Sequence, residues 1–264
     1  MFPLRDDIPS RRAPLLTWTI VGANLLVFLY QLGLDERGTQ QLFYLFGIVP
    51  ARFLHPAWAE RIGFPDAGLL PFFTSMFLHG GFFHLISNMW SLWIFGDNVE
   101  DRMGRLRYPI FYLLCGLLAG GVHALTNPSS AVPTVGASGA IAGVLGAYLR
   151  WYPHARVLTL IPILFYPWFV YLPALVYLGG WFVMQLFSGT ISLAGPEQVG
   201  GVAWWAHIGG FAAGFLLCGF FSKGDPEQIP GPRRHAIYPE APRSGAWRAP
   251  RGSGDDDLDR RLRL

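Results

Sequence analysis

Charged residues are scarce in this sequence. Asp, Glu, Lys and Arg make up 14% of its 264 residues, whereas an average soluble domain has about 25%. Hydrophobic residues make up 52%, and several apolar runs reach the roughly 20 residues that a membrane-spanning helix needs. This composition favours a membrane protein over a large soluble protein with buried core helices. The small net charge of +3 gives no indication of nucleic-acid binding.

Cysteine and acidic residues are missing where a metal or carboxylate centre would need them. The two cysteines, Cys115 and Cys218, fall in apolar segments and are interpreted as packing residues. No Asp or Glu occurs between Asp101 and Glu197. Paired buried aspartates, which an aspartyl intramembrane protease would use, are therefore lacking, and so is the H-E-x-x-H motif of a zinc metalloprotease.

Histidine provides the remaining metal alternative. A three-histidine site could form from His79, His84 and His207. However, His79 lies near the start of its apolar segment and is interpreted as an interfacial residue, as is His123. We therefore predict no metal site.

Long apolar runs are what the sequence has in place of charge, and they predict an all-α, polytopic membrane protein with six spans. The runs are continuous rather than alternating, as in helices and not in a barrel. They form a membrane domain over residues 15–222, between an N-terminal arm (1–14) and a polar, disordered tail (223–264). The segment 156–167 fits either an interfacial, strand-like loop or an early part of the fifth helix. The predicted spans are Leu15–Leu32, Pro71–Phe95, Tyr108–Leu125, Ser138–Arg150, Tyr171–Phe187 and Ala203–Phe221.

The basic residues predict the orientation of these spans. They are 19 Arg and one Lys, and outside the mixed-charge segment 34–70 they gather in alternate connections. Positively charged connections stay on the cytoplasmic side of a membrane. The arginine-bearing connections and both termini are therefore predicted to be cytoplasmic. The basic residues that decide this are Arg5, Arg11, Arg12, Arg102, Arg105, Arg107, Arg150, Arg156 and Lys223.

Three polar residues interrupt the apolar spans at a similar depth. The first charge on the cytoplasmic side follows Ser138 after 12 positions, His84 after 13 and His207 after 16. At 1.5 Å per residue these are rises of about 18 to 24 Å, so three parallel helices carry their polar groups in one layer. A polar side chain in hydrocarbon is costly, which favours a functional interpretation.

Small residues predict how two of these helices meet. Gly139 and Gly143 are four apart in the fourth span, and Gly210 and Gly214 are four apart in the sixth. Such faces let helix backbones approach closely in lipid. We therefore expect Ser138 and His207 to come within hydrogen-bond reach. The alternative is that the helices meet for packing alone and that Ser138 and His207 make incidental polar contacts between them.

The start of the fourth span suggests a site for acyl transfer. Its backbone N–H groups, at Ser138 and just beyond, have no partner within the helix and can stabilise an oxyanion. His84 and Asn88 are four residues apart, share a helical face and can donate to the same oxygen. Because no carboxylate is available, the pattern predicts a Ser-His dyad rather than a triad, with His207 as general base.

These residues resemble the motifs of the rhomboid family of intramembrane serine proteases, over about residues 5 to 222. The motifs are His84-x-x-x-Asn88, Gly136-Ala137-Ser138-Gly139, and Ala206-His207-x-x-Gly210-x-x-x-Gly214, in this order on three spans. The resemblance implies the six-helix rhomboid fold and hydrolysis of peptide bonds in or near transmembrane segments. It implies that Ser138 is the nucleophile, His207 the base, and His84, Asn88 and the Ser138 N–H the oxyanion hole.

The resemblance also carries expectations about partners. Substrates would be single-span membrane proteins in the lipid bilayer that enter sideways near the second and fifth helices, under the loop Ser188–Val202. No cofactor is implied. A bacterial cytoplasmic membrane fits the six-span form, and the oligomeric state stays open.

Two alternatives remain open. Where some family members stack an aromatic residue on the histidine, this chain has Ala142. His207 is therefore expected either to be held by Trp204, Trp205 or close packing, or to be less well oriented. The alternative function is a catalytically silent, rhomboid-like chaperone or adaptor that binds client helices.

Overall fold

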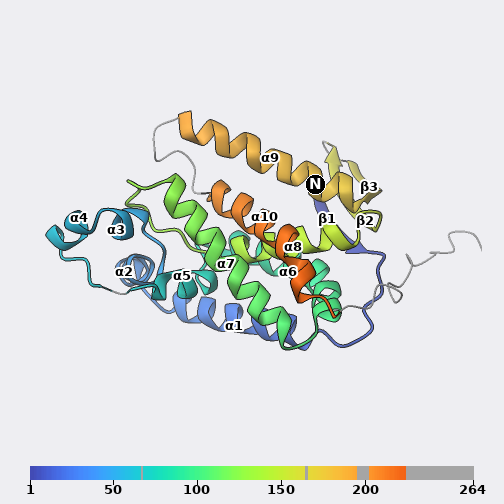
Figure 1. Cartoon of the computed structure of the whole chain (residues 1–264), viewed down its shortest axis with the longest axis horizontal. Helices are drawn as coiled ribbons and strands as arrows, with labels where there is room; N and C mark the ends of the chain where they lie inside the picture. Colours follow the sequence, from blue (N-terminus) through green and yellow to red (C-terminus); the bar gives the residue numbers. More distant parts are fainter. Residues whose placement is uncertain (67, 164–165, 195–201, 224–264) are drawn as a thin grey trace, which may run out of the picture. The chain divides into compact units, whose positions relative to one another are not determined.

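The computed structural model describes residues 1–66, 68–163, 166–194 and 202–223 (Figure 1). Helices dominate, and a small sheet lies beside them. The helices are α1 (Leu15–Leu32), α2 (Glu36–Phe46), α3 (Pro50–Leu54), α4 (Pro56–Arg61), α5 (Leu70–Thr74), η1 (Ser75–Phe77), α6 (Phe82–Met103), α7 (Arg107–Thr126), α8 (Ser138–Trp151), α9 (Ala174–Ala194) and α10 (Trp204–Phe221). The strands are β1 (Phe2–Asp6), β2 (Arg156–Ile163) and β3 (Tyr166–Pro173).

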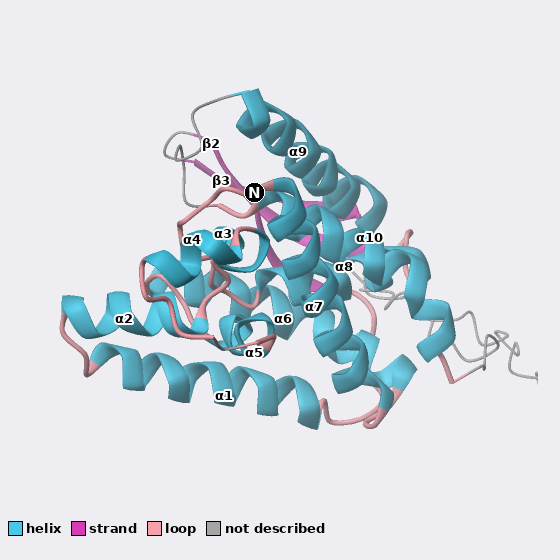
Figure 2. Cartoon of the chain, turned by 60° about the vertical axis from the view of Figure 1, so that its left-hand side comes forward, coloured by secondary structure: helices cyan, strands magenta, loops and turns pink. Residues whose placement is uncertain are grey.

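Helix α8 is the most enclosed of the helices. Every residue from Gly139 to Leu149 is buried, and α8 contacts α6, α7, α9 and α10. Figure 2 shows α7 and α10 running beside it. Glycine and alanine make up much of α8, and small side chains let neighbouring backbones come close. The residue at the start of α8, Ser138, is thereby held in a fixed place between its neighbours.

Four helices in the part of the chain that the structure describes are long and apolar enough to cross a bilayer, namely α1, α7, α9 and α10. Helix α6 has 22 residues but is interrupted by polar side chains such as His84, Asn88 and Asp97. Helix α8 has 14 residues, which cover about 21 Å of a hydrocarbon core of about 30 Å. The predicted count of six spans is therefore not confirmed.

The second predicted span, Pro71–Phe95, is wrong in its first part. A regular helix begins only at Phe82, after α5, η1 and an irregular stretch. Gly80 and Gly81 disfavour a helix there. The backbone of His79 pairs instead with the side chain of Gln31 in α1. The His79 N–H donates to Gln31 Oε1 (3.0 Å), and Gln31 Nε2 donates to the His79 carbonyl (2.8 Å). The side-chain amide of Gln31 thus provides hydrogen-bond partners for the N–H and C=O of His79, which lie outside a regular helix.

The prediction of an all-α fold is wrong for two segments. Strands β1, β2 and β3 form an antiparallel sheet in that order. The N-terminal arm supplies β1, and of the two interpretations of residues 156–167 the strand is correct. Because β3 extends to Pro173, the fifth predicted span begins as a helix only at Ala174 and not at Tyr171. Proline explains both outcomes, because Pro162, Pro167 and Pro173 lack an N–H and favour extended backbone at the preceding residue.

The predicted loop Ser188–Val202 also starts too early, because α9 continues to Ala194. Residues 195–201 lie outside the described part of the chain. The predicted tail, 223–264, lies outside it too, apart from Lys223.

The N-terminal end of α1 is capped from a distance by Glu100 of α6. No side chain of α1 caps this end within the described structure. The Glu100 carboxylate accepts hydrogen bonds from the backbone N–H groups of Leu16 (3.0 Å) and Thr17 (2.8 Å) and from the Thr17 hydroxyl (2.8 Å). A carboxylate is favourable there because unpaired N–H groups and the helix dipole make a helix N-terminus positive.

We expect Glu100→Ala to lower the free energy of unfolding by about 3 kcal/mol, since it leaves buried donors without an acceptor. Titration of the purified protein with a denaturing detergent measures this difference. Glu36→Ala, at an exposed carboxylate in α2, is the control and should change stability by less than about 0.5 kcal/mol. Equal stability of the two variants would contradict the capping role.

Candidate active site

Ser138 is the first residue of α8, and Gly136 shapes the turn that precedes it. Gly136 has a φ of +130°, in the left-handed region that favours glycine. A Cβ at this position would lie 2.7 Å from the ring of His84. The Gly136 N–H donates to the carbonyl of Ser75 (2.8 Å). The turn is therefore fixed between η1 and α6, and it places a half-buried Ser138 at the N-terminal end of α8.

His207 of α10 lies against Ser138. Its Nε2 is 2.8 Å from Ser138 Oγ. Glycines bring the two helices together. A Cβ at Gly210 would overlap the carbonyl oxygen of Gly139, and one at Gly214 would overlap that of Gly143. The predicted small-residue faces therefore touch backbone to backbone, and this contact sets the distance between hydroxyl and imidazole.

Gln185 of α9 is a site residue that the sequence interpretation missed. Its Oε1 lies 2.8 Å from His207 Nδ1, and only 3% of the residue is exposed. The Trp181 ring, one turn earlier in α9, lies 5.8 Å from the imidazole centroid at 34°. The signal was available, since Gln185 is a lone amide in an apolar span, as Asn88 is.

Of the residues expected to hold His207, only Trp204 contributes a ring. It meets the imidazole edge-on, with the centroids 6.4 Å apart. The Trp205 indole donates instead to the Gly189 carbonyl (3.2 Å). Ala142 is buried in the core. Trp181 of α9, and not a residue of α8, supplies the second ring beside the imidazole.

His84 and Asn88 of α6 both reach the turn before Ser138. The ring atoms Cε1 and Nε2 of His84 border Gly136, and Asn88 Nδ2 lies 3.7 Å from the place of a Cβ on Gly136. The Gly80 N–H points at His84 Nδ1 (3.4 Å), which assigns Nδ1 as acceptor and Nε2 as the proton-bearing nitrogen. Asn88 Nδ2 is buried and has no acceptor among the described residues. Two donors therefore border the glycine two residues before the serine.

The other buried histidines have structural surroundings. His123 Nε2 lies 2.8 Å from Thr134 Oγ1 and ties α7 to the loop before Ser138. His79 is buried beside His84, with ring centroids 5.1 Å apart. Among the described residues no group of three side chains is arranged to hold a metal ion.

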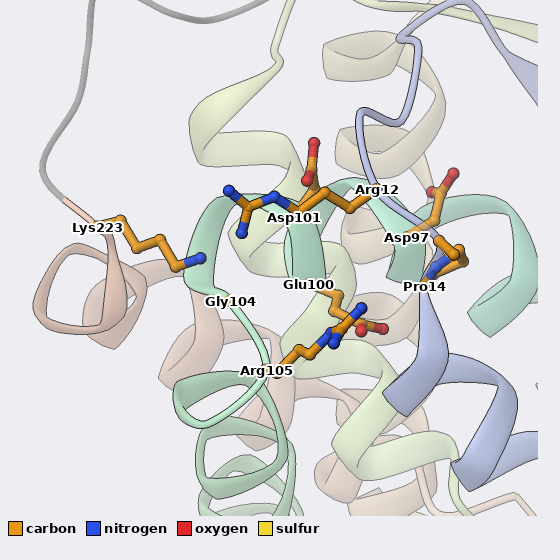
Figure 3. Close-up of a pocket in the computed structure, with 9 residues that line it drawn as sticks. Arg12, Pro14, Asp97, Glu100, Asp101, Gly104, Arg105 and Lys223 are labelled. Carbon is orange, nitrogen blue, oxygen red and sulfur yellow. The ribbon is translucent and has the colours of Figure 1, made fainter.

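Charge is concentrated far from these residues, at the other end of α6. A pocket there is lined by side chains of both signs (Figure 3). Asp97 is 13 residues beyond His84 in the same helix, which is about 20 Å along its axis. In α8, α9 and α10 the only charged residue is Arg150, which donates to the carbonyl of Phe215 (2.7 Å) near the opposite end of α8. The groups around Ser138 and His207 are therefore neutral dipoles. The charged residues of the pocket are Arg12, Asp97, Glu100, Asp101, Arg105 and Lys223.

Comparison with known proteins gives one family. The rhomboid domain model matches residues 66–224. The chain is 31% identical to RHOMBOID-like protein 6, mitochondrial, of Arabidopsis thaliana, over 80% of this chain and 70% of the relative. It is 32% identical to Rhomboid protein 1, mitochondrial, of Saccharomyces cerevisiae, over 58% and 42%. It is 33% identical to Rhomboid-like protein 11, chloroplastic, of Arabidopsis thaliana, over 52% and 41%. The chain thus spans less than half the length of the last two relatives.

The chain belongs to the rhomboid family, and it is an integral, multi-pass membrane protein. This family includes serine proteases and acts on membrane proteins within the bilayer. The names of the relatives place them in mitochondria and chloroplasts. These names conflict with the expectation of a bacterial membrane.

Proposed function

We propose that this chain is an intramembrane serine endopeptidase that cuts peptide bonds in or near transmembrane segments. The observation that carries the proposal is the 2.8 Å separation between Ser138 Oγ and His207 Nε2. A serine is a weak nucleophile on its own and becomes reactive beside a base within hydrogen-bond reach. Membership of the rhomboid family supplies the substrate class, membrane proteins.

In the proposed reaction, Ser138 Oγ attacks the scissile carbonyl carbon while its proton passes to His207 Nε2. The tetrahedral intermediate collapses when His207 returns that proton to the leaving amine, which breaks the C–N bond and leaves an acyl-serine. Water then attacks the ester, gives its proton to His207 and releases the acid, and the proton returns to Ser138. No cofactor takes part in these steps, which follow serine hydrolase chemistry without an aspartate.

The oxyanion of that intermediate would be held by three donors. They are the backbone N–H of Ser138, the Nε2–H of His84 and the unpartnered Nδ2 of Asn88. The dipole of α8 adds to them, since the oxyanion forms at its positive N-terminal end. A buried amide donor without an acceptor is costly in a resting protein. The missing acceptor is accounted for if the oxyanion accepts a hydrogen bond from Asn88 Nδ2 during turnover.

The substrates we propose are single-span membrane proteins, with both ends of this chain on the arginine-rich, cytoplasmic side. Helix α8 is too short to cross the bilayer. In the proposed orientation, Ser138 therefore lies within the bilayer, below the surface that faces away from the cytoplasm. We propose that a transmembrane segment reaches Ser138 from the side and meets water there.

The test is covalent labelling of the purified protein by a fluorophosphonate probe, together with cleavage of a single-span reporter. We expect the parent to be labelled and to cut, and Ser138→Ala to do neither. Ser87→Ala, at an exposed serine in α6, is the control and should behave as the parent. If the parent neither labels nor cuts but retains the reporter in a pull-down, the chain is the silent adaptor instead.

Asn88 provides a separate prediction. Asn88→Ala should lower kcat by about 10²- to 10³-fold, the usual effect of losing one oxyanion donor, with little change in KM. Steady-state cleavage of the reporter measures both constants. Asn24→Ala, at a buried asparagine in α1 that donates to its own helix at Ile20 (2.8 Å), is the control and should keep the parental kcat. An equal loss in both variants would mean that Asn88 acts through stability alone.

A further inference from the structure

A buried glutamine occupies the place where a serine hydrolase triad has its carboxylate. Gln185 belongs to α9, 22 residues before His207 in the chain. Its side-chain oxygen meets Nδ1 of the imidazole, while Nε2 meets the serine. The imidazole is therefore bonded through both nitrogens, to α8 on one side and to α9 on the other.

The chemistry of the glutamine oxygen decides which imidazole nitrogen carries the proton. A side-chain amide oxygen accepts hydrogen bonds and cannot donate them. Nδ1 of His207 must then be the donor, which leaves Nε2 with its lone pair directed at Ser138 Oγ. This is the tautomer that a general base needs, and the opposite tautomer could not take the serine proton.

We propose that Gln185 is the positioning residue that holds His207 in this tautomer and orientation. The proposal rests on the proposed serine protease function and deepens it. It fits the surroundings, because a carboxylate here would be a charge buried among neutral side chains, whereas an amide accepts the same hydrogen bond without that desolvation cost.

The packing of α9 fixes the glutamine in turn. The ring of Phe182 stacks on Phe211 of α10, with centroids 4.5 Å apart and an angle of 19°. Trp181 covers the imidazole from the same face of α9. Gln185 follows Trp181 by one helical turn and therefore lies on that face. The orientation of His207 thus depends on α9 being seated against α10, and not on α8 and α10 alone.

Three variants of α9 test this role. Gln185→Met keeps the length of the side chain but has no acceptor for Nδ1–H. Gln185→Glu keeps an acceptor oxygen at the same distance. Met184→Leu changes the exposed neighbour and serves as the control. The assays are kcat and KM on the reporter and the thermal midpoint in detergent. A third readout is the ¹⁵N NMR spectrum of the imidazoles, in which the His207 signals are assigned by their loss in His207→Ala.

We expect Gln185→Met to lower kcat by about 10- to 100-fold, as loss of an orienting partner does, while KM and the thermal midpoint stay near those of the parent. Gln185→Glu should recover kcat to within about threefold of the parent, because it keeps the acceptor, but should lower the thermal midpoint, because its carboxylate is a buried charge. The spectrum should show the proton on Nδ1 in the parent and a shift toward Nε2–H in Gln185→Met. Met184→Leu should match the parent in every assay.

Parental kcat in Gln185→Met, or an unchanged His207 spectrum in that variant, would overturn the proposal. So would a kcat in Gln185→Glu as low as that in Gln185→Met. Failure of the proposed function looks different, since the parent itself would then show no more cleavage than Ser138→Ala. The NMR comparison needs no turnover and still reports the tautomer in that case. If Gln185→Met does not fold, the tautomer in the parent and the kcat of Gln185→Glu decide.

Discussion

Replacement of Gly210 by alanine is expected to lower the rate of reporter cleavage by about 100-fold or more, although it adds only one methyl group. The methyl would overlap the carbonyl oxygen of Gly139 and lie 2.9 Å from its carbonyl carbon. Backbone atoms cannot move aside as a flexible side chain can, so α10 must shift away from α8. His207 is one helical turn before Gly210 and moves with it. A displacement of about 1 Å is enough for such a loss of rate.

The matched control is Gly219→Ala in the same helix. The nearest atom to a Cβ there is Arg150 Nη2, at 3.9 Å, so the methyl fits. We expect parental activity and equal or slightly greater stability, because alanine favours a helix over glycine by about 1 kcal/mol. Cleavage rates and thermal midpoints of both variants in detergent provide the measurement. A parental rate in Gly210→Ala would show that the close contact of α8 with α10 does not position the imidazole.

The glycine contact was predictable because its signal is local in the sequence. Gly139 and Gly143 recur at helical spacing, and so do Gly210 and Gly214. Their pairing follows from the need to bury small faces against each other in lipid. The common depth of Ser138, His84 and His207, obtained by counting residues to the nearest charge, stays a prediction. Both arguments use periodicity along single helices, which sequence displays directly.

Strand pairing was not predictable in the same way. Strand β1 lies more than 150 residues from its partner β2, with Phe2 opposite Leu160, and neither segment alone shows that the other completes its backbone hydrogen bonds. The interruption before α6 was missed for a similar reason. It depends on Gln31, a side chain of α1 that replaces helical hydrogen bonds at His79. Long-range partners of this kind have no signature within either segment.

Gln185 shows where the sequence interpretation of the site stopped too early. The absence of carboxylates between Asp101 and Glu197 excluded an aspartate partner for His207. An uncharged acceptor such as the Gln185 amide serves the same purpose and avoids burying a charge in the apolar core. The rule that flags lone polar residues in apolar spans applies equally to amides.

Loss of either Ser138 or His207 is expected to lower kcat by about 10⁴- to 10⁶-fold, and loss of both should cost no more than the larger single loss. The reason is the 2.8 Å contact between Oγ and Nε2. A base without its nucleophile, or a nucleophile without its base, leaves only binding and oxyanion stabilisation.

The experiment compares Ser138→Ala, His207→Ala and the double variant on the single-span reporter, with His154→Ala as the histidine control. His154 is exposed beyond the end of α8, and its removal should leave the rate unchanged. Two residues that act independently multiply their effects, so the double variant would then be far slower than either single one. Independent losses would mean that the serine and the imidazole do not work on the same proton. The shared hydrogen bond of the resting protein would then be a packing contact, and the proposed dyad would be wrong even if both residues were required.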